Sequence, residues 1–146
     1  HPHKMMKDWP DSGSQARVAH MSGGDFYESE KSTTVDSTRD VRIEFVAADG
    51  ATTELKEKFS LLAGEVIDSS VMNVKALRAF FADTNKEAKE KGVLLSLHLK
   101  ATMMTISDPI MFGHCVSVFY KDALEKHAPV LEGIGAILEG NTDLRN

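Results

Sequence analysis

Apolar and polar residues alternate most clearly between Val93 and Lys100, in the stretch VLLSLHLK. Leucines at every second position share one face, and the opposite face becomes polar toward its end. A period of two is typical of a β-strand, and a short apolar run of this kind favours a strand buried in a sheet. The sequence therefore predicts a buried strand whose last residue is Lys100. The two faces carry Leu95, Leu97 and Leu99 on one side, and Leu94, Ser96, His98 and Lys100 on the other.

Extended elements are also predicted earlier in the chain. Val41 to Val46 alternates in the same way and is followed by Asp49 and Gly50. An Asp-Gly pair tolerates the positive φ angles of a type I′ turn, so we expect an antiparallel hairpin near residues 41–57. Gly64 to Met72 is a further extended segment with apolar residues.

A helix is predicted between this extended segment and the Val93 strand. Asn73 can cap its first turn, and Gly92 can take the left-handed conformation that ends a helix. The apolar residues at helical spacing are Val74, Leu77, Phe80, Phe81 and Ala88. The other side of this helix is charged, which is typical of a solvated face.

Apolar sequence continues after Lys100, through the β-compatible segment Ala101 to Ile106. Ser107 or Asp108 can then cap a second helix, whose first turn suits Pro109 because proline lacks an amide donor. Pro129 ends this helix and permits a short one after it. The predicted buried stripe of the second helix is Phe112, Cys115, Val116, Phe119 and Ala123.

These elements together predict an α/β fold, with a mixed sheet that contains the hairpin and with helices packed on the sheet. The length of 146 residues fits one domain, residues 1–146. Residues 1–40 are expected to be largely irregular, since prolines, glycines and serines interrupt them.

Composition narrows the classes of partner and compartment. The net charge of -5 gives no basic surface, so we expect no nucleic-acid partner. No apolar run approaches the length of about 18 residues that suggests a membrane helix, so no membrane contact is expected. A single cysteine, Cys115, excludes an intrachain disulfide and fits a reducing compartment. We therefore expect a cytoplasmic protein.

Candidate chemistry centres on Lys100. The sequence has no glycine-rich phosphate loop, no HExxH or CxxC metal motif and no Gly-x-Ser-x-Gly elbow. In open α/β sheets, small molecules bind beyond the carboxyl ends of strands, where the predicted strand places Lys100. Such a lysine could neutralise a substrate carboxylate, transfer a proton or form a Schiff base, and its spacing from His98 and Ser96 does not choose among these roles. Cys115 and His114 are interpreted as structural residues.

A family resemblance adds to this interpretation. LLSLHLKATMMTISDPIMFGH, together with VRIEFVAADGATTELK, GEVIDSSVM and HPHKMM, resembles the monomeric class of NADP-dependent isocitrate dehydrogenase, from His1 to about Gly135. That family's polypeptide is several times longer. The resemblance implies a partial domain of the isocitrate/isopropylmalate dehydrogenase-like fold, within the large domain of a longer enzyme. His1 is not a methionine, so we expect an internal piece.

The resemblance also implies an activity of the parent enzyme, a member of the tricarboxylic acid cycle. Isocitrate is oxidised by NADP and loses carbon dioxide to give 2-oxoglutarate, with Mg²⁺ or Mn²⁺ as the metal. The family's substrate-site lysine matches Lys100, with a role in substrate contact and proton transfer. The remaining substrate, metal and cofactor residues of the family lie outside this segment. We therefore assign no metal or NADP ligand here, interpret Asp108 as a helix cap, and expect the isolated piece to be inactive.

One departure and several alternatives remain open. The family pattern predicts a lysine after the two methionines, where this chain has Thr105. One alternative function is a lyase that forms a Schiff base through Lys100, and another is a non-enzymatic binding or scaffold domain. The expected partners are isocitrate and the rest of the parent polypeptide. Self-association of the fragment through exposed apolar surface is a further open possibility.

Overall fold

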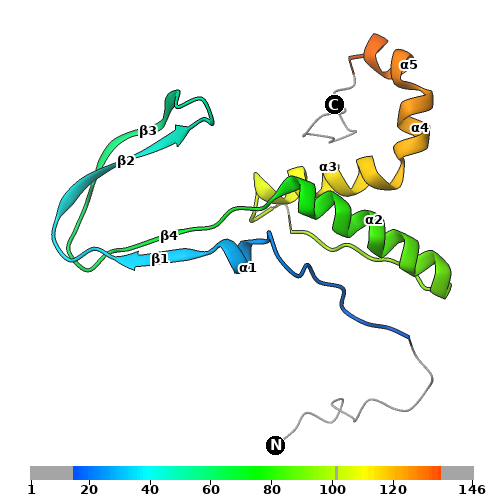
Figure 1. The fold of residues 1–146 in the computed structure, drawn as a ribbon, viewed down its shortest axis with the longest axis horizontal. Coiled ribbons are helices and arrows are strands. Elements are labelled where there is room, and N and C mark those ends of the chain that lie inside the picture. Colours follow the sequence, from blue (N-terminus) through cyan, green and yellow to red (C-terminus); the bar gives the residue numbers. More distant parts are fainter. Residues whose placement is uncertain (1–14, 101, 136–146) are drawn as a thin grey trace, which may run out of the picture. The chain divides into compact units, whose positions relative to one another are not determined.

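The computed structural model describes residues 15–100 and 102–135, and Figure 1 shows the helices and strands along the chain. The chain divides into two compact units. Residues 24–72 make up what we call the strand unit, and residues 15–23 with 73–135 are the described part of the helical unit. No helix in the described part of the chain has the length and apolar character needed to span a membrane.

The first sheet of the strand unit joins its two ends. Helix α1 (Phe26–Ser29) leads into β1 (Lys31–Thr34), which pairs antiparallel with β4 (Val66–Ser69). The extended segment expected at 64–72 is therefore confirmed, whereas α1 and β1 lie in a region that we expected to be largely irregular. The ladder continues one residue further, because the Val35 amide donates to the Glu65 carbonyl at 2.8 Å. Val35 is the buried apolar residue of this unit.

The second sheet is the expected hairpin. Strands β2 (Arg39–Val46) and β3 (Thr52–Leu61) pair antiparallel. The predicted type I′ turn is wrong, because it requires positive φ at both central residues and only glycines have positive φ among the described residues. Gly50 donates to the Ala47 carbonyl at 2.9 Å and has a φ of 85°, while Ala47 donates to the Ala51 carbonyl at 2.8 Å. The connection is a three-residue loop in which a left-handed glycine follows a tight turn.

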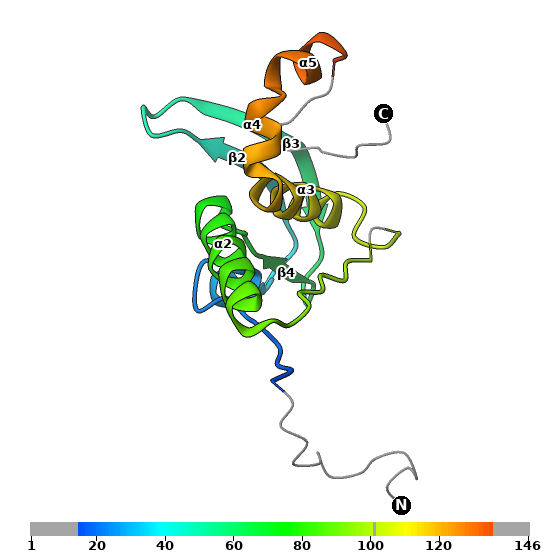
Figure 2. The same ribbon diagram turned by 90° about the vertical axis from the view of Figure 1, so that its right-hand side faces the viewer.

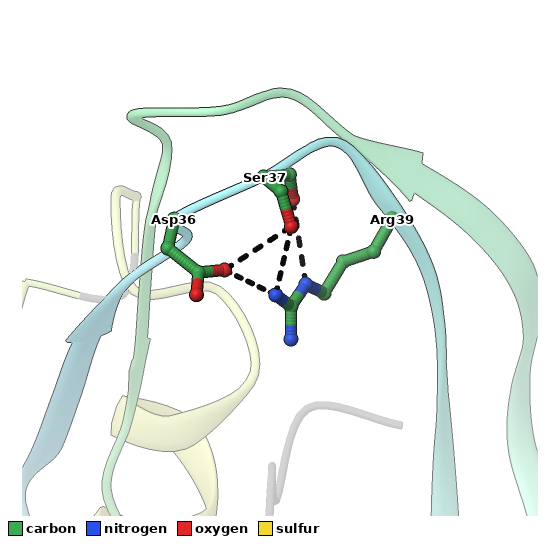
Figure 3. Close-up of polar contacts among 3 residues, drawn as sticks. All are labelled: Asp36, Ser37 and Arg39. Carbon is green, nitrogen blue, oxygen red and sulfur yellow. Dashed lines mark hydrogen bonds and ion pairs between the residues drawn. The ribbon is translucent and has the colours of Figure 1, made fainter.

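Polar side chains close the loop that joins β1 to β2. The Arg39 guanidinium forms an ion pair with Asp36 and donates to the Ser37 hydroxyl at 2.9 Å and to the Ser37 carbonyl at 3.3 Å (Figure 3). All three residues are exposed. Because each contact is made within a few residues, this cluster shapes the loop and needs no external ligand to explain it.

Helix α2 (Val74–Lys91) is the longest element of the helical unit and follows its sequence signals. The Asn73 side chain accepts a hydrogen bond from a backbone amide of the first turn at 3.0 Å, and Gly92 ends the helix with a φ of 63°. The predicted cap and stop are both confirmed. Leu77 and Phe81 are its buried residues.

Three helices follow in the same unit. Helix α3 (Ser107–Phe119) packs on α2, and α4 (Lys121–Lys126) and α5 (Ala128–Gly133) continue from it. The single helix expected through Ala123 is wrong, because the chain bends after α3. The predicted buried stripe also fails in part, since Phe112 and Phe119 are 48% and 61% exposed. The Phe119 ring does meet the Tyr120 ring edge to face, with centroids 4.8 Å apart.

Residues 93–100 do not form the predicted strand. The segment runs back beside α2 without a strand partner (Figures 1 and 2). Its burial does alternate as expected, with Leu95, Leu97 and Leu99 half-buried and the intervening residues exposed. A strand requires a neighbouring ladder, and among the described residues the backbone of this segment has none.

The predicted mixed sheet is likewise wrong for the described residues, which form two separate two-stranded antiparallel sheets. Helices do pack in this structure, but α2 and α3 pack on one another. Of the β-compatible segment after Lys100, residues 102–106 adopt turns, and Ala101 lies outside the described residues. What the sequence predicted as one sheet layer is thus divided between a helical unit and two short ladders.

Candidate functional site around Lys100

The backbone of Lys100 is held on both sides. Its amide donates to Oδ2 of Asp108 at 2.9 Å. Its carbonyl accepts from the amides of Met103 and Met104 at 3.0 and 3.2 Å. The chain therefore turns sharply after Lys100 and returns to it through the first turn of α3.

Asp108 is the one buried charged residue among the described residues, with 7% of its surface exposed. Besides the Lys100 amide, its carboxylate accepts from the Ser107 hydroxyl at 3.4 Å, and its own amide donates to the Met104 carbonyl at 3.2 Å. The predicted role as a helix cap is wrong: α3 begins after Ile106 with no side-chain cap, and Asp108 lies within its first turn. The carboxylate instead accepts a hydrogen bond from the Lys100 backbone amide, eight positions earlier in the chain. Helix-capping rules consider only residues within about one turn of the helix end.

The Lys100 side chain is exposed. Its ammonium makes no hydrogen bond or ion pair with any other described residue. The ammonium is thus available to an anionic ligand.

Ser96 and His98 share the exposed side of the segment that ends at Lys100, as predicted. The Ser96 hydroxyl lies 2.6 Å from Nε2 of His98. This contact links the side chains of Ser96 and His98. With Lys100, they form a row of three exposed polar residues at every second position.

Three cavities lie beside residues 93–97, on the side of the segment that faces the helices. Their volumes are about 410, 300 and 770 Å³, and all three are lined by Leu94 and Leu95. Their linings are largely apolar; the 300 Å³ cavity is bounded by Phe80, Phe81 and Cys115. Lys100 lines none of these three cavities. None of these three cavities is therefore a pocket at the Lys100 side chain.

Two titratable side chains of α3 have structural roles. Burial raises the pKa of the Cys115 thiol, which opposes the thiolate form that a nucleophile needs. Burial, and secondarily the charge of Arg78, lower the pKa of His114. The Arg78 guanidinium donates to Nδ1 of His114 at 3.3 Å, which favours the neutral imidazole and links α2 to α3. Both findings agree with the structural roles expected from the sequence.

The described residues contain no cluster of metal-ligating side chains. Within residues 15–100 and 102–135, no three His, Cys, Asp or Glu side chains gather closely enough to hold a metal ion. Thr105, which replaces the lysine expected from the family pattern, is exposed in the turn before α3. The chemistry that these residues offer is therefore that of a single exposed ammonium on a fixed backbone.

Sequence comparison identifies the family to which this chain belongs. The fold and the site at Lys100 define only an α/β protein with one candidate polar site. A family model described as monomeric isocitrate dehydrogenase matches residues 1–145. The chain belongs to the monomeric isocitrate dehydrogenase family.

Individual relatives agree with the family match. The isocitrate dehydrogenase (NADP) of Azotobacter vinelandii is 58% identical over 135 residues, which are 92% of this chain and 18% of that protein. Isocitrate dehydrogenase (NADP) 2 of Colwellia maris is 58% identical over 122 residues, 84% of this chain and 16% of that protein. Isocitrate dehydrogenase (NADP) 2 of Mycobacterium tuberculosis is 48% identical over 145 residues, 99% of this chain and 19% of that protein. The chain spans less than a fifth of the length of these relatives.

Proposed function

We propose that this chain contributes a substrate-site lysine, Lys100, to a longer NADP-dependent isocitrate dehydrogenase of the monomeric class that acts in the cytoplasm. The observation that carries the proposal is the family match across residues 1–145. The LHLKATMM motif, which resembles the family's substrate-site segment, supports Lys100 as the lysine. The exposed, unpaired ammonium is compatible with this role.

The proposed reaction converts isocitrate to 2-oxoglutarate in two steps. The substrate's secondary alcohol loses a hydride to NADP and a proton from its oxygen, which gives a keto acid. The neighbouring carboxylate then leaves as carbon dioxide, and the resulting enolate takes up a proton at carbon. When bound, NADP would supply the hydride acceptor, and a divalent cation would supply a Lewis acid for the hydroxyl and keto oxygens.

Lys100 would act on the negative charge that develops on the substrate during these two reaction steps. An ammonium beside the substrate oxygen stabilises the negative charge that appears there and can transfer a proton to or from it. The positive charge also favours a substrate with three carboxylates. Because no described cluster of side chains could hold the metal, we propose that the metal and NADP ligands come from the rest of the polypeptide.

Substitution of Lys100 in the full-length enzyme tests the proposal. Lys100→Met keeps most of the side-chain length and removes the charge. Loss of a general acid or base lowers turnover by about 10²- to 10⁴-fold, so we expect kcat to fall in that range with a smaller change in the KM for isocitrate. Lys89→Met on the exposed side of α2 is the matched control and should retain normal kinetics. Unchanged turnover in the Lys100 variant would remove this residue from the mechanism.

The isolated 146-residue chain is proposed to be inactive. Among the described residues, the buried apolar side chains are Val35 in the strand unit and Leu77 and Phe81 in the helical unit, whereas Leu94 and Ile106 are 93% and 76% exposed. Apolar surface of this extent calls for a covering partner, and we propose that the rest of the parent polypeptide supplies it. The purified chain should therefore not reduce NADP with isocitrate and Mg²⁺, and such a reduction would contradict the proposal. Concentration-dependent size-exclusion chromatography would show whether copies cover one another instead.

A further inference from the structure

We infer that Asp108 is a positioning residue for the proposed catalytic Lys100. Its buried carboxylate holds the backbone of Lys100 so that the lysine side chain leaves the chain in one fixed direction. The inference rests on the proposed function, because it gives Asp108 a catalytic effect only if Lys100 acts on the substrate.

The first argument is the hydrogen bond itself. Oδ2 of Asp108 accepts from the Lys100 amide at 2.9 Å, across eight positions of sequence, in a part-buried setting. Asp108 is only 7% exposed, so water competes poorly for this carboxylate. A charged acceptor makes a stronger hydrogen bond than a neutral one, particularly away from water.

The second argument is that the peptide groups on both sides of the Lys100 Cα atom are held. Asp108 binds the amide, while the amides of Met103 and Met104 bind the carbonyl. With both peptide planes restrained, the direction of the Cα–Cβ bond is restrained too. The flexible part of Lys100 is then limited to its side-chain torsions.

The third argument is that Asp108 connects Lys100 to a packed helix. Asp108 lies in the first turn of α3, which packs on α2. A carboxylate in that turn also interacts favourably with the positive end of the helix dipole. The position of Lys100 is therefore tied to the better-buried part of the helical unit rather than to the turn at residues 102–106 alone.

The fourth argument concerns charge. The carboxylate binds the backbone amide of Lys100, and the ammonium has no ion pair with any described residue. Asp108 thus orients the lysine without neutralising it. This arrangement suits a cation that must meet an anionic substrate.

Two substitutions in the full-length enzyme separate this role from a general effect on folding. Asp108→Ala removes the acceptor, whereas Asp108→Asn retains an oxygen that can accept from the Lys100 amide. A misplacement of about 1 Å can cost about 10²-fold in rate, so we expect Asp108→Ala to lower kcat by about 10- to 100-fold with a smaller change in KM. Asp108→Asn should restore kcat to within about 3-fold of the wild type. Asp122→Ala, at an exposed carboxylate of α4, is the matched control.

Amide hydrogen exchange of the peptide that contains Lys100 provides a second readout in the same proteins. We expect the Lys100 amide to be protected in the wild type and in Asp108→Asn, and to exchange faster in Asp108→Ala. Should Asp108→Ala not fold, the asparagine variant decides: near-normal kcat with protection supports the inference, and low kcat in the folded protein overturns it. Normal kcat in folded Asp108→Ala overturns it as well.

The Lys100→Met variant keeps the two hypotheses apart. If Lys100→Met retains turnover, the proposed function fails and the catalytic part of this inference fails with it. If Lys100→Met is inactive while Asp108→Ala has normal kcat, only the positioning role is wrong.

Discussion

The helical unit and the strand unit hold their folds by different means. In the helical unit, Leu77 and Phe81 of α2 are buried, and α2 packs on α3. The carboxylate of Asp108, in the first turn of α3, is buried as well. In the strand unit, Val35 is the buried hydrophobic residue, and every residue of β1 and β4 is exposed. The first unit thus has a small core, whereas the second depends on its backbone ladders.

Polar side chains supplement those ladders in the hairpin. The Asp40 carboxylate accepts from the Ser60 hydroxyl at 2.5 Å and pairs with the Lys58 ammonium at 2.7 Å. The Lys56 ammonium lies 4.7 Å from the centre of the Phe59 ring. Exposed contacts of this kind each add little, and a two-stranded ribbon is marginally stable in water by itself. The candidate site is therefore built on the part of the chain that has a core.

The largest expected difference comes from truncating one phenylalanine in each unit. Phe81 is 5% exposed and Phe45 is 56% exposed. Removing a buried phenylalanine typically costs about 3–5 kcal/mol, so Phe81→Ala should strongly destabilise the helical unit. Phe45→Ala should change stability by less than about 1 kcal/mol. Urea unfolding of this chain, followed by hydrogen exchange of peptides from each unit, measures both; equal effects would contradict the proposed contrast.

A smaller effect is expected at the hairpin turn. Gly50 has a φ of 85° and no atom near the position of an added Cβ, so Gly50→Ala is strained only through its backbone. A side chain in this left-handed region costs roughly 1–2 kcal/mol. Gly133→Ala, in α5 and also without nearby atoms, has no such φ and should not destabilise. Faster exchange of β2 and β3 amides should appear with Gly50→Ala and not with Gly133→Ala.

Acid should weaken the helical unit through His114. The pKa of this imidazole is lowered from 6.5 by burial and by Arg78, so the folded state favours its neutral form. Its contribution to stability is complete above the unfolded pKa and is lost as the pH falls through the folded pKa. Amides of α2 and α3 should therefore exchange faster, relative to the intrinsic rate, below about pH 6.5. His114→Gln should remove that pH dependence; if it persists, another group is responsible.

The smallest effects are expected in the strand unit, where two exposed carboxyls respond to pH in opposite directions. A hydrogen bond with Asp68, and then its charge, raise the pKa of Glu30, so its contribution is present at low pH and is lost as the pH rises through the folded value. Hydrogen bonds from Lys58 and Ser60, and the Lys58 charge, lower the pKa of Asp40, so its contribution is lost as the pH falls. NMR titration of the two carboxyls checks both directions. Glu30→Gln and Asp40→Asn should abolish the respective pH dependences of β1–β4 and β2–β3 exchange.

Local sequence signals predicted the elements that depend on local interactions. Asn73 and Gly92 delimit α2 because a cap and a left-handed stop act within one helical turn. The hairpin near residues 41–57 was likewise predicted, although its turn type was not. Alternation and family resemblance together singled out Lys100 as the candidate residue.

Interactions between distant residues account for what the sequence predicted incorrectly. A strand at residues 93–100 requires a neighbouring strand, which the described residues do not supply. The side chains therefore alternate between half-buried and exposed, but the backbone forms no β-ladder. Capping rules placed Asp108 at a helix end, whereas its carboxylate binds an amide eight positions away. Many sequences have an acidic residue a few positions after a lysine. The spacing of Lys100 and Asp108 alone therefore does not predict the hydrogen bond between them.

The sequence by itself determined the family, the limits of α2, the hairpin and the lysine that merits a kinetic test, because motifs, caps and alternation are properties of neighbouring residues. Only the tertiary structure decided which side chains are buried, how α2 and α3 meet, and that Asp108 holds the backbone of Lys100. Burial and hydrogen bonding between separate segments depend on how the chain returns to itself, and no local pattern encodes that return.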